Sequence, residues 1–191
     1  MIEIRIHGRG GQGNVVAAYL LAAAAFEEGL YPQAFPNFGA ERRGAPVTAF
    51  VRIADRPIRR RCQVLEPAFL IVQDDTLLHL SDITAGLQTG GAILVNSNRT
   101  SAELAEQLGC DVVALPAGAM AQEILGRPVP NTALLSAFLE LTGLLPRSAL
   151  LKALGERFHG AVLEKNRQLV ERAAAEVDTG AWQEGPHAVR A

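Results

Sequence analysis

The chain has 191 residues, of which 49% are hydrophobic, and it carries a formal net charge of −2. This length suits one well-cored α/β domain, and the composition excludes a disordered chain and a generic binder of polyanions such as nucleic acid. No apolar run reaches the roughly 18 to 20 uncharged residues of a membrane helix, and the chain does not begin like a secretory signal, so we expect no membrane association.

The two cysteines of the chain, Cys62 and Cys110, stand far apart in the sequence. Isolated cysteines are typical of a reducing compartment and indicate a cytoplasmic protein. An iron–sulfur cluster takes about four cysteines, and the four scattered histidines include no H-x-x-x-H pair. We therefore expect this chain to hold neither a cluster nor another metal by itself.

The first predicted elements are a strand at 2–6, a glycine-rich loop and a helix at 14–28. Gly8, Gly10 and Gly13 have the spacing G-x-G-x-x-G. This spacing lets the backbone turn sharply and approach a ligand closely, with the next helix N-terminus aimed at an anion. The sequence thus predicts a phosphate-binding loop, with a purely structural tight turn as the alternative.

A nicotinamide or flavin dinucleotide would need one more feature, an Asp or Glu about 20 residues further on to hold the ribose hydroxyls. After the first helix the chain reads Gly29-Leu-Tyr-Pro-Gln-Ala-Phe-Pro-Asn-Phe-Gly39, and no carboxylate follows until Glu41. The sequence therefore disfavours an NAD- or FAD-dependent enzyme.

A second unusual segment runs from Phe35 to Pro46 and combines glycines, prolines and phenylalanines with the pair Arg42-Arg43. Its composition indicates a loop. One interpretation is a long connection whose aromatic rings dock on the core. The other is a recognition loop in which Arg42 and Arg43 donate to a phosphate or to a partner's carboxylate.

The rest of the chain alternates strands with helices and ends in helices alone. A strand at 47–53 precedes the turn at 55–57, and 58–63 is expected to return as an antiparallel hairpin strand. Further strands are expected at 69–72, 92–95 and 111–115, and helices at 76–87, 101–108, 117–125, 131–143, 147–158 and 160–177. This order predicts an α/β fold: a doubly wound, mostly parallel sheet with an antiparallel hairpin and a helical C-terminal third.

The two loops together resemble the paired motifs of a known family. The stretches Gly8-Arg-Gly-Gly-Gln-Gly13 and Phe35-Pro-Asn-Phe-Gly-Ala-Glu-Arg-Arg-Gly44-Ala-Pro46 look like those of the gamma subunit of 2-oxoacid:ferredoxin oxidoreductases, of which pyruvate:ferredoxin oxidoreductase is the best known. The resemblance covers 1–177, which we expect to be a single α/β gamma-type domain. It leaves 178–191 as an irregular C-terminal extension.

The resemblance implies a complex that oxidatively decarboxylates a 2-oxoacid, transfers the acyl group to coenzyme A and passes electrons to ferredoxin or NAD. Thiamine diphosphate, Mg and [4Fe-4S] clusters would lie in partner chains, namely the alpha and beta subunits and a ferredoxin-like delta subunit. This chain would be a non-redox subunit that helps to bind coenzyme A and to assemble the complex. The expected ligand-binding residues are Gly8, Arg9, Gly10, Gly11, Gln12, Gly13, Arg42, Arg43, Arg127 and Asn131, with no catalytic residue and no metal ligand.

Several alternatives remain open at this point. A stand-alone nucleotide-binding regulatory module could use the same glycine loop without belonging to an enzyme. Asn131 also fits the N-cap of the helix at 131–143. The run Arg59-Arg60-Arg61 fits either a solvated edge that blocks aggregation or a contact for an acidic partner. Asp74-Asp75 is expected to cap the helix that starts at Thr76, and the polar residues 96–98 to form a turn.

Overall fold

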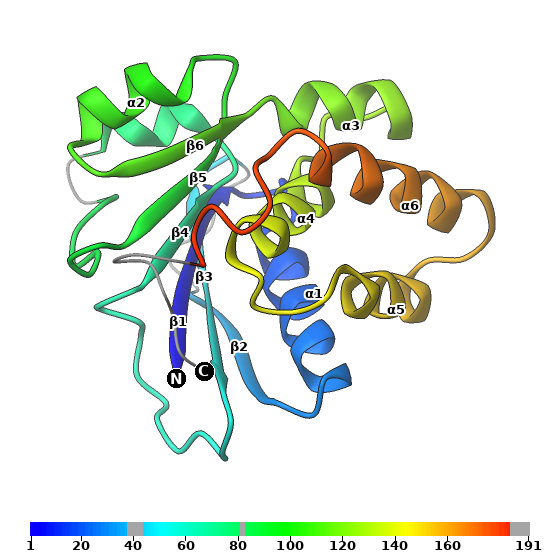
Figure 1. The fold of residues 1–191 in the computed structure, drawn as a ribbon, viewed down its shortest axis with the longest axis horizontal. Helices are drawn as coiled ribbons and strands as arrows, with labels where there is room; N and C mark the ends of the chain where they lie inside the picture. Colours follow the sequence, from blue (N-terminus) through cyan, green and yellow to red (C-terminus); the bar gives the residue numbers. More distant parts are fainter. Residues whose placement is uncertain (38–43, 81–82, 184–191) are drawn as a thin grey trace.

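A computed structural model describes residues 1–37, 44–80 and 83–183, and in these residues six strands form one mixed sheet (Figure 1). The strands follow the order β2-β3-β1-β4-β5-β6. Strands β1, β4, β5 and β6 are parallel, whereas β3 is antiparallel to both of its neighbours, β1 and β2. Their bounds are β1 (Ile2–Arg9), β2 (Tyr31–Asn37), β3 (Pro46–Ala54), β4 (Phe69–Val72), β5 (Ala92–Asn96) and β6 (Asp111–Leu115). The predicted α/β fold is confirmed.

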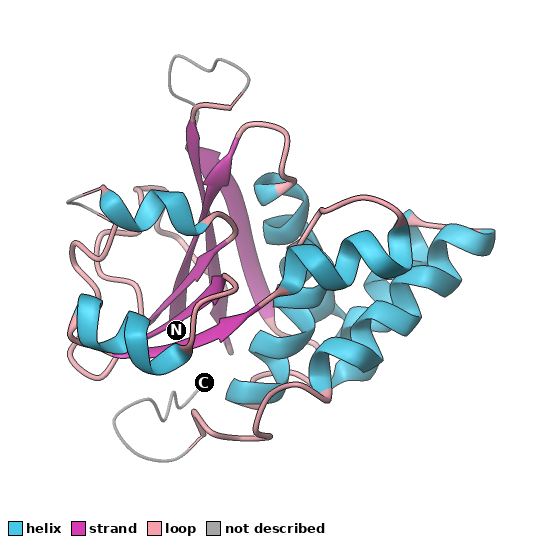
Figure 2. Ribbon diagram, turned by 90° about the horizontal axis from the view of Figure 1, so that it is seen from above, coloured by secondary structure: helices cyan, strands magenta, loops and turns pink. Residues whose placement is uncertain are grey.

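Helices cover both faces of the sheet unequally (Figure 2). Side chains alternate along β1, so that Ile2, Ile4 and Ile6 join the larger apolar core beneath the bulk of the helices. A smaller core forms around Leu70 and Val72 on the opposite face. The first face carries α1 (Asn14–Glu27), α3 (Ala117–Leu125), α4 (Asn131–Thr142), α5 (Arg147–Arg157) and α6 (Gly160–Ala174), and the second carries α2 (Ser101–Leu108) and the 3₁₀ helix η1 (Asp75–His79).

The predicted hairpin strand at 58–63 is wrong, because these residues form a strand-free connection. Besides β1, the antiparallel neighbour of β3 is β2, whose last three residues, 35–37, belong to the segment that the sequence indicated as a loop. Since β1 occupies the other side of β3, no free edge remains for a further strand. β2 accommodates two prolines because it lies at the edge of the sheet, where a missing N–H costs no ladder bond.

The predicted helix at 76–87 is also wrong. Asp74 does cap this segment, since its carboxylate accepts from the Thr76 N–H at 3.1 Å. Only the short η1 follows, because Leu80 is already extended at ψ 126° and Gly86 has φ +74°, which ends regular helix. Leu77 and Leu78 from η1, together with Ile83, all reach the smaller core.

The last third is helical as predicted, within three residues at each end. The described part of the tail, 178–183, is made of turns and packs on this helical region. Trp182 is 2% exposed, and its ring stacks on Phe69 with a centroid separation of 5.7 Å. The boundary at 177 stays a prediction. None of the helices in the described part of the chain combines the length and apolar character that crossing a membrane requires.

Candidate functional site

The glycine loop connects β1 directly to α1. β1 runs to Arg9, and the backbone then takes positive φ angles at Gly11 (+100°) and Gly13 (+84°), which a side chain would strain. Gly13 is the N-cap of α1 and supplies no side chain to the first N–H groups of the helix. The N-terminus of α1 therefore keeps the positive end of the helix dipole open to a ligand.

Two glycines of the loop make room for asparagines. A Cβ on Gly8 would lie 2.2 Å from Oδ1 of Asn14, the first residue of α1, whose Nδ2 donates to the Val47 carbonyl at 3.1 Å. A Cβ on Gly13 would lie 2.8 Å from Nδ2 of Asn131. The fold thus brings the start of α4 against the start of α1, although these residues are more than a hundred positions apart in the chain.

The side chains of Arg9 and Gln12 are engaged within the protein. The Arg9 guanidinium donates to Asp74 Oδ2 at 3.1 Å, to the Gly44 carbonyl at 3.1 Å and to Thr76 Oγ1 at 2.7 Å. Gln12 donates to the same Asp74 oxygen at 2.9 Å and accepts from the Arg9 N–H at 2.7 Å. These contacts fix the shape of the loop, so its backbone, rather than these two side chains, is the part available to a ligand.

Asp74 organises this network. Burial by itself would raise the pKa of Asp74, but hydrogen bonds from Thr76 and Gln12 and the charge of Arg9 outweigh it and lower the pKa below 3.8. A carboxyl whose pKa is lowered by folding stabilises the fold fully above its unfolded pKa and loses that contribution as the pH falls through the folded pKa.

We expect Asp74→Asn to lower the free energy of unfolding by about 1.5–3 kcal/mol at pH 7, because a charge-assisted acceptor of several donors is lost. Urea unfolding of both proteins measures the difference, which should shrink as the pH falls below about 4. Asp55→Asn, at an exposed residue, is the control and should change stability by less than about 0.5 kcal/mol. An Asp74→Asn protein as stable as the control variant would contradict this role.

A shallow depression of about 290 Å³ opens beside the loop. It lies past the carboxyl end of β1, where β1 feeds a crossover towards β2 while β4 feeds one towards β5. Open α/β sheets bind ligands at such reversals of strand order. The depression is lined by Arg9, Gly10, Gly11, Gly13, Asn14, Val15, Val16 and Val47.

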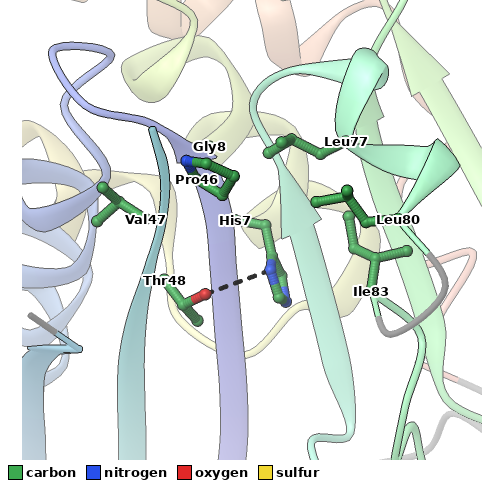
Figure 3. A pocket seen from close by; sticks show the side chains of 8 residues that line it. All are labelled: His7, Gly8, Pro46, Val47, Thr48, Leu77, Leu80 and Ile83. Carbon is green, nitrogen blue, oxygen red and sulfur yellow. Dashed lines mark hydrogen bonds between the residues drawn. The ribbon is translucent and has the colours of Figure 1, made fainter. Parts of the chain in front are cut away.

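A smaller pocket of about 100 Å³ lies near the same end of β1 (Figure 3). His7 lies between Thr48, whose Oγ1 is 3.5 Å from its Nδ1, and the apolar side chains of Leu80 and Ile83. This volume is about that of three or four water molecules, too small for a nucleotide. His7 sits within β1 rather than at its end, because the strand continues to Arg9.

The comparisons with known proteins agree on one family. The family model for pyruvate ferredoxin/flavodoxin oxidoreductases matches residues 3–176. The chain belongs to this family. It is 51% identical to the pyruvate/ketoisovalerate oxidoreductases common subunit gamma of Thermococcus kodakarensis, over 91% of this chain and 95% of that one. It is 47% identical to the pyruvate synthase subunit PorC of Methanothermobacter thermautotrophicus, over 93% and 97% of the two chains.

Solved structures of the family show the same fold. The pyruvate oxidoreductase subunit PORC of Thermotoga maritima superposes with a TM-score of 0.83 at 36% identity, covering 91% of this chain and 95% of that one. A 2-oxoglutarate:ferredoxin oxidoreductase from Magnetococcus marinus superposes at 0.73 and 23% identity, over 91% of this chain and 30% of that one, which supports the fold alone. The chain is thus a gamma-type subunit of a 2-oxoacid:ferredoxin oxidoreductase complex.

The ligand-binding residues expected from the sequence fall into three groups. Gly8 to Gly13 and Asn131 come together as described. Asn131 is not the N-cap of α4, because Pro130 holds that position, but its Oδ1 accepts the Thr132 N–H at 2.8 Å. Arg127 is exposed just after the C-cap of α3, and Arg42 and Arg43 lie outside the described residues.

Sequence reasoning missed two residues that shape the site in this family member. Asn14 was treated only as the start of a helix, and Asp74 only as a cap. The signal for Asp74 was its position two residues after β4, at the same sheet edge as the glycine loop. Among the described residues, no group of three His, Cys, Asp or Glu side chains could hold a metal ion.

Proposed function

We propose that this chain helps to bind coenzyme A within a 2-oxoacid:ferredoxin oxidoreductase complex of the cytoplasm, and that the N-terminus of α1 receives one of the phosphates. The complex would convert a 2-oxoacid, such as pyruvate, to its acyl-CoA. Thiamine diphosphate, Mg and [4Fe-4S] clusters would be bound by alpha, beta and delta partners. This chain would contribute no redox group, and it would assemble with these partners.

The observation that carries the proposal is the open helix N-terminus beside a depression at the carboxyl edge of the sheet. Coenzyme A carries a diphosphate and a ribose phosphate, which match free helix N–H groups. The cap Gly13 has positive φ and no side chain that would compete for them. The Nδ2 of Asn131 faces the same residue and adds a neutral donor.

Arginines near the loop would complete the recognition of phosphate. Arg42 and Arg43 directly precede Gly44, whose N–H donates to the Gly10 carbonyl at 3.3 Å. The Gly10 N–H in turn donates to the Ala45 carbonyl at 2.9 Å. Arg127 precedes α4 by a few residues and is exposed. We propose these three arginines as phosphate ligands, since the Arg9 side chain is already used by Asp74.

Gly11→Ala tests the proposal, because a Cβ at Gly11 would meet no atom of the described residues within 4 Å and would occupy space beside the loop. In the assembled enzyme we expect the KM for coenzyme A to rise about ten- to a hundredfold, as for the loss of a charge-assisted bond of about 1.5–3 kcal/mol. The KM for the 2-oxoacid should not change. The measurement is steady-state kinetics with coenzyme A as the varied substrate.

Gly109→Ala is the matched control. Gly109 also has positive φ (+67°) and open space around its Cβ position, but it ends α2, far from the loop in the fold. The two variants therefore share the backbone strain and differ in location. If both leave the KM for coenzyme A equal to that of the wild type, the glycine loop is scaffolding and the ligand assignment is wrong.

A stand-alone nucleotide-binding regulator is the second candidate, and one observation favours it: the depression and the open helix end belong to this chain alone. It predicts that the isolated chain binds a nucleotide tightly and purifies without other subunits. Native purification of the tagged chain distinguishes the two functions.

A further inference from the structure

The run Arg59-Arg60-Arg61 takes no part in the proposed coenzyme A site, and the structure removes one of its two interpretations. These residues lie in the connection between β3 and β4, and they do not form an edge strand. The edge strand nearest to them is β2, which already carries Pro32 and Pro36. Prolines at an edge block further pairing by themselves, so the arginines are not needed to protect the sheet.

The backbone of the run is fixed to the sheet. Nε2 of Gln33, in β2, donates to the Arg60 carbonyl at 2.8 Å. Three residues after Arg60, the Gln63 carbonyl accepts from the buried Arg52 at 3.2 Å, and Gln63 in turn donates to Asn37 Oδ1 at 2.9 Å. The connection is therefore held along the face of β2 and β3, on the side of the sheet away from α1 and α4 (Figure 1).

The three guanidinium groups of this run are available to a partner. Arg59, Arg60 and Arg61 are exposed, and within the described residues their guanidinium groups make no hydrogen bond and no ion pair. The three charges are consecutive in the chain, and the hydrogen bond to the Arg60 carbonyl holds their backbone against β2. A chain with a net charge of −2 thus presents a local cationic surface next to the sheet.

An exposed aromatic residue lies on the same face. Tyr31 and Gln33 are two residues apart in β2, so their side chains point to the same side of the sheet. Tyr31 is 46% exposed although it belongs to a strand. Arginine and tyrosine are the residue types that protein–protein interfaces favour.

We propose that Arg59, Arg60, Arg61 and Tyr31 form a docking surface for an acidic face of another subunit of the complex. This inference rests on the proposed function in one respect, the existence of partner subunits. An acidic protein fits better than a nucleic acid, because the chain as a whole is slightly negative and would repel an extended polyanion outside this patch. Exposed interfacial charges act mainly on association and on its salt dependence.

The test compares two triple variants in the co-expressed complex. Arg59→Gln/Arg60→Gln/Arg61→Gln removes three charges from the patch, and Lys165→Gln/Arg167→Gln/Arg172→Gln removes three from exposed positions of α6. Each tagged chain is immobilised with its bound subunits and washed with rising NaCl. We expect the NaCl concentration that releases half of the partner to fall about twofold or more for the patch variant alone. Adding Tyr31→Ala to the patch variant should lower this NaCl concentration further.

The outcomes distinguish a failure of the docking surface from a failure of the proposed function within the complex. A wild-type chain recovered without any other subunit overturns both of them. A complex that forms, and whose release by salt is the same for both triple variants, overturns only the docking surface. Thermal unfolding of each isolated variant, expected within 2 °C of the wild type, shows that lost binding is not lost folding. Binding of a labelled single-stranded 20-mer DNA that depends on the three arginines would instead make the patch a nucleic-acid site and overturn the proposal.

Discussion

Trp182→Ala is expected to lower the free energy of unfolding by about 3–5 kcal/mol, the usual cost of emptying a buried aromatic site. The indole is 2% exposed and stacks on Phe69, which also meets Phe138 edge-on at 5.4 Å. The backbone N–H of Trp182 donates to the Leu141 carbonyl at 2.8 Å. One side chain from the tail thus packs on β4 beside α4 and is buried there.

Urea unfolding followed by far-UV circular dichroism measures this loss. Fluorescence does not serve, because Trp182 is the one tryptophan of the chain. Phe26→Ala is the control, since Phe26 is 70% exposed on α1 and its removal should cost less than about 0.5 kcal/mol. A chain that ends at 177 should be destabilised at least as much as Trp182→Ala. Equal stability of that chain and the wild type would show that the tail does not contribute to the core.

Glu3→Ala is expected to lower the free energy of unfolding by about 3–5 kcal/mol, because it leaves a buried charge without its counter-ion. The side chain of Arg52 is 1% exposed, and its Nε donates to Glu3 Oε1 at 2.6 Å. Its other contacts are neutral: Gln33 Oε1 at 3.0 Å, the Gln63 carbonyl at 3.2 Å and the Phe35 ring at 5.5 Å.

The double variant Glu3→Leu/Arg52→Leu distinguishes the cost of an unpaired buried charge from the net contribution of the ion pair to the free energy of unfolding. It should be much closer in stability to the wild type than Glu3→Ala, since two apolar side chains replace both charges. Arg172→Ala is the exposed control, because the pair of Arg172 with Glu176 at 2.9 Å is solvated and should contribute less than about 1 kcal/mol. If Glu3→Ala costs no more than this control, the buried pair is not a stabilising element.

The two networks have different consequences for function. Arg52 fixes the connection that carries the proposed docking surface, whereas Asp74 fixes the glycine loop that carries the proposed coenzyme A site. They lie on different parts of the sheet, so variants in one network should leave the readout of the other unchanged. This separation lets assembly and coenzyme A binding be measured independently in the same complex.

The sequence by itself determined the local features. Periodic apolar residues placed β1, α1, β5, α2, β6 and the four C-terminal helices correctly, because their hydrophobic pattern agrees with the fold. A cap adds to this pattern in α2. The capping box of α2 is an example: Thr100 and Glu103 exchange side-chain bonds with each other's backbone N–H. The paired motifs at Gly8–Gly13 and 35–46 were sufficient for the family, since both depend on the order of residues rather than on their packing.

Only the tertiary structure decided which segments meet. Composition marked the segment 35–46 as a loop, yet its first three residues end the edge strand β2, whose prolines are compatible with an edge and which pairs with β3. The pattern at 76–87 indicated a helix, but the short η1 and the turn after it bring Leu77, Leu78 and Ile83 to the smaller core. The contacts of Gly13 with Asn131 and of Arg9 with Asp74 join residues far apart in the chain, and chain spacing carries no information about such contacts until the sheet order is known.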